Sequence, residues 1–365
     1  MTPLFINGKF SAQRLTGVQR YAECLLRALD ELPTPLGVPP LILLCPQGAR
    51  PLGLRRIVQR SLGPAGLPLH AWEQFVLPFA ARSGLLLNLS GSAPAWGMRR
   101  QICTLHDAAV FDVPQAFSRT FLRWYTTLFG HAARRALALI TVSEFSLQRL
   151  SQVLPAASGR LSVIPNGADH LEGVAADERV LDALNLRGTR FFLAVATANP
   201  VKNLPRLKLS MAGLDAALVI VGGTNARVFA APAVEPVPGA ARVVHAGPLG
   251  DAEMKALLQH AVALVCPSLY EGFGLPVVEA MATGCPVASS GCAALPEVTG
   301  AAALTFDPLS GAAITAAMQT LLDNPTLSRQ LKAAGHAQAG RYRWSHSAAL
   351  LADLLATVQQ LDRVT

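Results

Sequence analysis

Short apolar runs alternate with amphipathic stretches along the whole of this 365-residue chain. The runs have the length of buried strands, and the stretches between them repeat apolar residues at the spacing of helices. This alternation is typical of βα units, in which helices cover a parallel sheet. In the first half, strands are predicted at residues 4–7, 41–45, 85–89, 101–105, 138–142 and 161–164.

Two helices of the first half have recognisable limits. The first begins after Thr16, which is expected to form a capping box with Gln19. Its apolar face repeats at helical spacing through Val18, Tyr21, Leu25 and Leu29. The second runs from about residue 117 to 138, with aromatic and apolar residues on one side and arginines elsewhere around it.

A polar stretch without a strand pattern, from His170 to Arg190, marks a change in composition and predicts a linker. The βα pattern then restarts. Strands are predicted at residues 191–196, 216–221, 242–246, 262–266 and 286–289, and a last helix at about 344–360 has no strand after it. We therefore predict two doubly wound α/β domains of similar architecture, residues 1–172 and 173–344.

The composition fits a cytoplasmic globular protein. Apolar residues make up 51% of the chain and charged residues 15%, which excludes a disordered chain. The scattered cysteines form no C-x-x-C pair and predict reduced thiols without a metal site: Cys24, Cys45, Cys103, Cys266, Cys285 and Cys292. The first residues lack a signal-peptide pattern, and no apolar stretch reaches the ~18 residues of a membrane-spanning helix.

The net charge of +8 is unevenly distributed. Residues 1–170 contain 17 Lys and Arg against 8 Asp and Glu, whereas residues 171–365 contain 14 against 15. Of the 31 basic residues 26 are Arg, a bias that suits phosphate contacts but that a GC-rich coding sequence would also produce. The basic half indicates an anionic partner, either a membrane surface or nucleic acid. The helix at 117–138 is the candidate for membrane contact, unless its apolar side belongs to the core.

Polar residues and glycines follow the predicted strands of the second half, at the edge where parallel sheets bind ligands. These turns share glycines, a lysine and a carboxylate. They comprise Thr197 to Asn203, Gly222 to Thr224, Gly247 with Pro248, and Pro267 to Gly274. Their convergence on one edge favours a phosphate-bearing ligand.

The fourth turn leads into a helix suited to an anion. Gly272 and Gly274 flank Phe273 just before a helix that has Pro276 in its first turn. Free amide groups and the positive end of the helix would therefore face the ligand. The helix is expected to end at Gly284.

Two carboxylates and a lysine accompany these amides. Glu271 and Glu279 lie eight residues apart and can bind two hydroxyl clusters of one ligand, such as a ribose diol and a hexose diol. Each also has a simpler interpretation. Glu279 could be a solvent-facing helix residue, Glu271 a loop charge and Lys202 a solvated loop lysine. Likewise, the role of Gly222 and Gly223 could be limited to permitting a tight turn.

Several segments resemble family 4 of the retaining nucleotide-sugar glycosyltransferases. Residues 268–287 (SLYEGFGLPVVEAMATGCPV) resemble its E-x7-E signature. Further matching segments are LPEV at 295–298, FDP at 306–308, VATANPVKNL at 195–204, TLHD at 104–107, TVSEFS at 141–146, IPNG at 164–167 and TGVQRY at 16–21. The segments at 16–21 and 195–204 resemble a mannosyltransferase-like subgroup, and the matches span nearly the whole chain.

The resemblance implies the GT-B fold, in which two Rossmann-like domains face each other across a cleft and the last helix, here 345–365, returns to the first domain. Glu279 would hold the ribose hydroxyls, Glu271 and the amides at 273–275 the donor hexose and diphosphate, and Lys202 the diphosphate charge. The donor-binding residues implied are Gly17, Thr197, Lys202, Asn203, Gly222, Gly247, Glu271, Gly272, Phe273, Gly274, Leu275 and Glu279.

In the first domain the resemblance places the helix start at Gly17 near the phosphates and His106 on the transferred sugar. We prefer a neutral, hydrogen-bonding His106, although its neighbour Asp107 also permits an acid–base dyad or a metal site. The subgroup usually carries Arg before the lysine, where this chain has Val201. Either an arginine of the first domain, such as Arg20, completes the charge balance or the donor is bound weakly.

The mechanism implied is front-face transfer with retention, in which the leaving phosphate oxygen receives the acceptor proton. His106, Glu271 and Lys202 would be the catalytic residues. No metal ion is expected, in keeping with a chain that contains no Asp-x-Asp sequence. The donor would be GDP-mannose, alternatively dTDP-rhamnose or a UDP-hexose, with no separate cofactor. The acceptor would be a saccharide or polyprenyl-linked saccharide of an O-antigen, capsule or exopolysaccharide.

Three other classes of function fit the residues less well. A non-catalytic sugar-nucleotide-binding or scaffolding protein would agree with Val201 but not with the intact Lys202, Glu271 and Glu279. A nucleic-acid-binding protein would use the basic half, which lacks helix-turn-helix, zinc and aromatic ribonucleoprotein motifs. A dehydrogenase would require G-x-G-x-x-G after a first strand, and neither half has it.

Overall fold

The computed structural model of the chain describes residues 3–33, 41–98, 100–197, 199–223 and 242–361. By their internal contacts these residues form two compact units. The first unit comprises the described residues of 1–108, 123–166 and 344–365. The second comprises those of 109–122 and 167–343.

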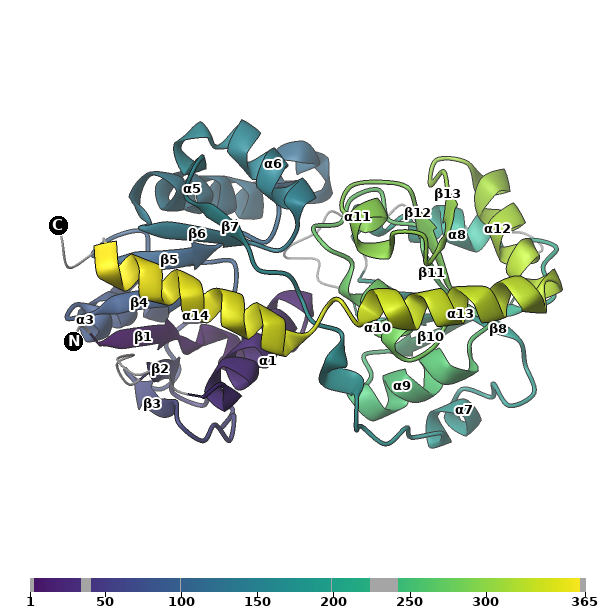
Figure 1. Cartoon of the computed structure of the whole chain (residues 1–365), viewed down its shortest axis with the longest axis horizontal. Coiled ribbons are helices and arrows are strands. Elements are labelled where there is room, and N and C mark those ends of the chain that lie inside the picture. Colours follow the sequence, from purple (N-terminus) through teal and green to yellow (C-terminus); the bar gives the residue numbers. More distant parts are fainter. Residues whose placement is uncertain (1–2, 34–40, 99, 198, 224–241, 362–365) are drawn as a thin grey trace. The chain divides into compact units, whose positions relative to one another are not determined.

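The first unit is built on a parallel sheet with the strand order β3-β2-β1-β4-β5-β6-β7 (Figure 1). The strands are β1 (Leu4–Asn7), β2 (Leu41–Pro46), β3 (Val58–Leu62), β4 (Leu85–Asn88), β5 (Gln101–Thr104), β6 (Ala138–Thr141) and β7 (Leu161–Val163). This is the order of a Rossmann-like sheet, and every strand predicted in this half is confirmed. The sequence does not predict β3, because this edge strand is mostly polar and exposed.

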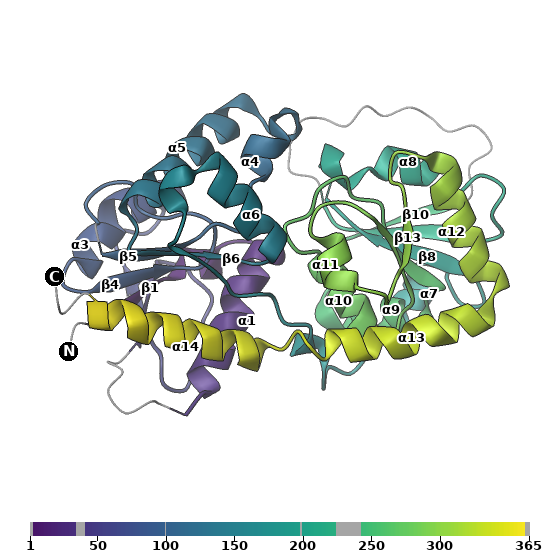
Figure 2. The same cartoon turned by 45° about the horizontal axis from the view of Figure 1, so that its top comes forward.

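Helices cover both faces of this sheet, α5 and α6 on one side and α1 and α14 on the other (Figure 2). The helices are α1 (Gly17–Glu31), α2 (Leu69–Ala71), α3 (Leu77–Ala81), α5 (Arg119–Arg135), α6 (Glu144–Val153) and α14 (Trp344–Leu361). Tyr21 of α1 donates a hydrogen bond to the carbonyl of Ile164 at 3.1 Å, and Ser347 of α14 donates to that of Pro165 at 2.7 Å. The predicted last helix is thereby fixed to the chain after β7.

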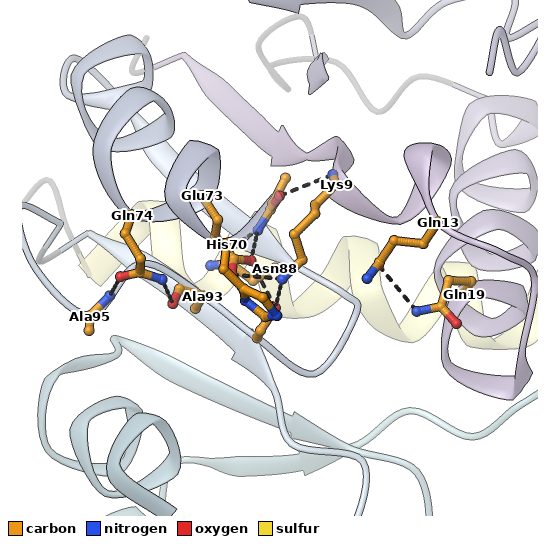
Figure 3. Close-up of polar contacts among 11 residues, drawn as sticks. Lys9, Gln13, Gln19, His70, Glu73, Gln74, Asn88, Ala93 and Ala95 are labelled. Atoms are coloured by element: carbon orange, nitrogen blue, oxygen red, sulfur yellow. Dashed lines mark hydrogen bonds and ion pairs between the residues drawn. The ribbon is translucent and has the colours of Figure 1, made fainter. Parts of the chain in front are cut away.

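The start of α1 differs in one respect from the prediction. The helix begins after Thr16 as expected, and Tyr21, Leu25 and Leu29 are buried. However, the Thr16 side chain makes no capping bond to the backbone and contacts the side chain of Gln19 instead. Gln19 in turn donates to Gln13 at 3.2 Å (Figure 3). The predicted capping box is therefore wrong, because Gln19 is turned toward another side chain.

The second unit repeats this plan with a parallel sheet in the order β10-β9-β8-β11-β12-β13. The strands are β8 (Phe191–Val195), β9 (Ala217–Val221), β10 (Val243–Gly247), β11 (Ala263–Cys266), β12 (Val287–Ser290) and β13 (Leu304–Phe306). The strands predicted in this half are confirmed. The short strand β13 is not predicted, since Phe306 is its one buried residue. The two doubly wound sheets confirm the predicted fold class.

In the second unit, α8 and α12 lie on one side of the sheet and α9, α10 and α13 on the other (Figure 2). Its helices are α4 (Ala109–Asp112), α7 (Arg179–Ala183), α8 (Leu204–Leu209), α9 (Asp251–His260), α10 (Leu275–Ala282), α11 (Leu295–Thr299), α12 (Gly311–Asp323) and α13 (Pro325–Ala339). Phe192, Leu218 and Met318 are fully buried in the core under α8 and α12. Asp112 of α4 accepts a hydrogen bond from Tyr270 at 3.0 Å, a contact that ties α4 to this unit.

Two sequence expectations concern the whole chain. All the cysteines are free thiols, as predicted, and Cys45, Cys103 and Cys285 are buried. In the part of the chain that the structure describes, no helix combines the length and apolar character needed to span a membrane.

Candidate functional site

The turn after β8 is held in place by the turn after β11. Asn203 adopts the left-handed conformation with φ of 56°. Its buried side-chain amide donates to the carbonyls of Pro267 at 3.1 Å and Pro308 at 2.8 Å. In addition, the Leu269 N–H donates to the Val201 carbonyl at 2.7 Å. These bonds use the amide of Asn203 to shape the loop and fix Lys202 beside the turn after β11.

Lys202 and Glu271 form an ion pair at this edge of the second sheet. The Lys202 Nζ lies 2.6 Å from the Glu271 Oε1, to which the Ser268 hydroxyl also donates at 2.7 Å. The side chains are 21% and 13% exposed, so neither is a freely solvated loop charge. Because Glu271 offsets the charge of Lys202, a bound diphosphate would also depend on backbone N–H groups nearby.

Such N–H groups are present at the start of α10. Gly274 has a φ of 96°, and a Cβ there would lie 2.6 Å from a methyl group of Leu295. Among the described residues no acceptor contacts the N–H groups of Phe273, Gly274 and Leu275, although all three residues are buried. Buried amides without an acceptor at a helix start suit an anionic ligand. As predicted, Pro276 lies in the first turn of the helix.

Glu279 lies inside the unit and is not a solvent-facing residue. It is 7% exposed, and its Oε1 lies 2.9 Å from the Nε2 of His170, which donates because a carboxylate accepts. His170 belongs to the short turn Asp169–Leu171 that follows the IPNG segment. Sequence reasoning assigned His170 only to a linker. The partnership joins residues 109 positions apart, and no local pattern signals it.

The glycine turns have a packing explanation. Gly222 has a φ of 142°, and a Cβ there would collide with the carbonyl oxygen of Ala196. Its N–H donates to the Gly247 carbonyl at 2.8 Å. The close approach of the turns after β8, β9 and β10 therefore accounts for this glycine without a ligand. The nearby Thr197 is partly exposed, and Ala198 and Thr224 lie outside the described residues.

In the first unit, His106 follows β5 and is neutral. Its Nε2 lies 3.1 Å from the Leu89 carbonyl, and the Tyr21 ring meets its edge with centroids 5.0 Å apart. Burial lowers the pKa of His106 to about 4, against the smaller opposite effect of the Leu89 carbonyl. The imidazole is thus uncharged at neutral pH, as predicted, which argues against an acid–base dyad with Asp107.

Two glycines accompany His106 in this unit. Gly17 is exposed at the start of α1, and a Cβ on Gly91 would lie 3.4 Å from the His106 ring and 3.9 Å from Val18. The start of α1, the turn after β4 and the residue after β5 therefore meet at the carboxyl edge of the first sheet. Among the residues with described positions, no three His, Cys, Asp or Glu side chains are grouped as a metal site would require.

A buried ion pair supports this edge, and the sequence does not predict it. The Lys9 Nζ lies 2.7 Å from the Glu73 Oε2, with the two side chains 2% and 0% exposed (Figure 3). Asn7, the last residue of β1, donates to Glu73 at 2.8 Å and to Asn88 of β4 at 3.0 Å. Lys9 and Glu73 also each contact the hydroxyl of Ser92. The network links the ends of β1 and β4 to the turn beside His106.

Comparison with known proteins gives two family matches along the chain. Residues 15–170 match the model described as Glycosyltransferase Family 4. Residues 180–338 match the model described as Glycosyl transferases group 1. The two matches follow each other without overlap and correspond closely to the two sheets.

Among its relatives, the chain is 28% identical over 260 residues to O-antigen chain mannosyltransferase B of Escherichia coli, a match that covers 68% of each chain. It is 32% identical over 244 residues to the MMP alpha-(1->4)-mannosyltransferase of Mycolicibacterium hassiacum, covering 62% of this chain and 56% of that one. The matched segment thus spans little more than half of the second relative.

Solved structures resemble the chain over its full length. Sucrose-phosphate synthase from Thermosynechococcus elongatus has a TM-score of 0.72 at 20% identity and covers 100% of both chains. Anabaena HepE, in complex with UDP and glucose, has a TM-score of 0.71 at 17% identity and covers 98% of this chain and 100% of its own. At these identities the similarity establishes the fold.

Proposed function

Because the chain belongs to the glycosyltransferases in which a Family 4 half precedes a group 1 half, and has their GT-B fold, we propose that it transfers mannose from GDP-mannose. The acceptor in this proposal is a saccharide or polyprenyl-linked saccharide of a surface polysaccharide. The mannosyltransferase activity named for two relatives supports the choice of sugar. One observation carries the proposal. Lys202, Glu271 and the N–H groups of residues 273–275, which have no acceptor among the described residues, lie together at one edge of the sheet.

In the proposed complex the second unit binds the donor. Glu279, oriented by His170, accepts hydrogen bonds from the ribose hydroxyls, and the N–H groups at 273–275 hold the diphosphate together with Lys202. Glu271 accepts from hydroxyls of the hexose. Because Lys202 already touches Glu271, the sugar and the diphosphate would be bound by two adjacent, coupled groups.

The proposed reaction retains the anomeric configuration. Negative charge develops on the leaving diphosphate and positive charge at the anomeric carbon. Lys202 and the amides stabilise the negative charge on the diphosphate, so the step needs no metal ion in this mechanism. The departing phosphate oxygen takes the acceptor proton as the acceptor oxygen attacks on the same face. The Nε2–H of a neutral His106 donates to the Leu89 carbonyl, so its Nδ1 would accept a hydrogen bond from a sugar hydroxyl without carrying charge.

A donor panel tests the proposal. GDP-mannose, dTDP-rhamnose and UDP-glucose would each be offered with free and polyprenyl-linked saccharides, with and without EDTA, while nucleotide diphosphate release and product mass are followed. Proton spectra of the product anomeric centre report retention. We expect turnover with GDP-mannose that EDTA does not remove. The proposal would be contradicted if none of the three donors were turned over, or if the product had the inverted anomeric configuration.

Glu279→Ala should raise KM for the donor by about 10- to 100-fold, since it removes a charged acceptor of ribose hydrogen bonds. Glu297→Ala, a change to an exposed glutamate on α11 in the same unit, serves as the control. Full activity of Glu279→Ala would refute the assignment of the ribose site.

His170→Ala is expected to raise KM for the donor about 10-fold with little change in kcat, because His170 orients the carboxylate of Glu279 and is not assigned to the reacting atoms. His170→Gln keeps an N–H near the position of Nε2 and should recover most of the affinity. His260→Ala removes a half-exposed histidine paired with an exposed Glu178 and should change neither constant. Equal losses in the Ala and Gln variants would point to a packing role instead.

A further inference from the structure

Two phenylalanines project from one helical run of the first unit. The run is continuous from α2 through a π-helical turn (Trp72–Val76) into α3. Phe75 is 70% exposed and Phe79 is 74% exposed, four residues further on, so both lie on neighbouring turns of one face. Trp72 and Leu77, by contrast, are fully buried against the sheet.

An exposed tryptophan borders the same turns. Gln74 donates to the Ala93 carbonyl at 3.1 Å and accepts from the Ala95 N–H at 2.8 Å (Figure 3). A Cβ on Gly97 would lie 3.2 Å from Pro78. Trp96, 62% exposed, stands between these two anchored points. We call Phe75, Phe79 and Trp96 the aromatic patch.

The stretch of chain that carries the aromatic patch is basic. Between Glu31 and Asp107 the chain contains seven arginines and a single acidic residue, Glu73. Glu73 is fully buried and paired with Lys9, so this stretch presents no carboxylate to solvent in its described residues. The exposed Arg82 follows Phe79 by three positions and continues the same face.

The neighbouring helix α5 adds to this charge. Its Trp124 ring lies 6.1 Å from the ring of His70 at the start of the same helical run. Arg123, Arg134 and Arg135 of α5 are exposed, and the helix contains no acidic residue. Its aromatic residues, however, are buried or partly buried, and Leu128 and Phe129 are buried. The candidate membrane helix of the sequence analysis thus contributes arginines, whereas the exposed rings come from 75–96.

We propose that the aromatic patch docks this unit on an anionic lipid surface. Exposed aromatic rings partition into the headgroup region, and exposed arginines such as Arg82 and Arg123 bind lipid phosphates. The inference builds on the proposed function, because a polyprenyl-linked acceptor has to be reached at a membrane. The anchoring of the Trp96 loop by Gln74 and Pro78 keeps the rings presented together.

Vesicle sedimentation of the full chain tests this proposal. Phosphatidylcholine vesicles with and without phosphatidylglycerol would be compared at low and high salt. We expect binding to the anionic vesicles that weakens as salt rises. The variant Phe75→Ser/Phe79→Ser/Trp96→Ser should bind at least about 10-fold more weakly, since three apolar groups leave the interface.

The matched control is Leu209→Ser/Leu309→Ser, which removes two exposed leucines of the second unit, 56% and 66% exposed. It should bind as the wild type does. Thermal unfolding checks that each variant is folded. The proposal would be overturned if the triple variant bound as well as the wild type, if the wild type bound neutral and anionic vesicles equally, or if it bound neither. It would also be overturned if the wild type self-associated and the triple variant did not. Transfer to a soluble saccharide needs no vesicle, so its loss would instead contradict the proposed function.

Discussion

Lys202→Ala should lower kcat for nucleotide-sugar transfer by about two to three orders of magnitude. Lys202 is the side-chain cation that the turn after β8 places at the site, 2.6 Å from Glu271. In the proposed complex its interaction with the diphosphate would strengthen as the leaving group gains charge, so the loss should appear in kcat more than in KM. The size of the effect is that of removing one preorganised donor from an oxyanion site. Steady-state kinetics with GDP-mannose measure it.

The control is Lys208→Ala, which removes a partly buried lysine of α8 in the same segment. It should leave kcat within about twofold, as expected for surface changes away from the site. Thermal unfolding should be nearly unchanged in both variants. If Lys202→Ala keeps a kcat close to that of Lys208→Ala, Lys202 is only a structural partner of Glu271.

The ion pair also predicts coupling between two substitutions. Glu271→Ala would remove the proposed hydrogen-bond acceptor for the hexose and leave Lys202 without its carboxylate, although Ser268 remains nearby. Because both residues are proposed to bind one donor and they touch each other, the double variant should lose less activity than the product of the two single losses. If the activity loss of the double variant equals the product of the two single losses, the two side chains act independently on separate steps.

The sequence predicts well where residues are buried by local pattern. Strands β8 and β9 are apolar throughout, and they were located within about one residue. The turns after β8 and β11 bring Lys202, Glu271 and Gly274 to one edge because parallel strands end together. Strand β3 could not be predicted, since an edge strand with one solvent-facing side needs no apolar pattern.

Local sequence patterns do not predict polar partners that are far apart in the chain. His170 meets Glu279 across 109 residues, and Lys9 meets Glu73 across 64. In the sequence each has the appearance of an ordinary surface charge. Their pairing depends on how β1, the π-helical turn and α10 are placed by the packed sheets, so tertiary structure decides it.

Breaking the pair between Lys9 and Glu73 should cost the protein about 3–5 kcal/mol of unfolding free energy. Both side chains are buried, and Glu73→Ala would leave the Lys9 ammonium in the protein interior, where the Ser92 hydroxyl is its one remaining partner among the described residues. The same change would remove one of the two acceptors of the Asn7 side-chain amide, which now donates to Glu73 and Asn88. Urea denaturation of the full chain, followed by tryptophan fluorescence, measures the loss.

Lys9→Met/Glu73→Leu separates the charge from the packing. Removing both partners leaves no uncompensated charge, so this double variant should be clearly more stable than Glu73→Ala. Asp182→Ala, which breaks an exposed pair with Arg187, should lower the unfolding free energy far less than Glu73→Ala does.

The apolar replacement still removes the bonds that hold Ser92 and Asn7, and with them the support of the turn at Gly91 beside His106. A stable double variant with reduced kcat and unchanged donor KM would therefore identify the pair as positioning residues for the first unit. A stable double variant with full activity would assign them to folding alone.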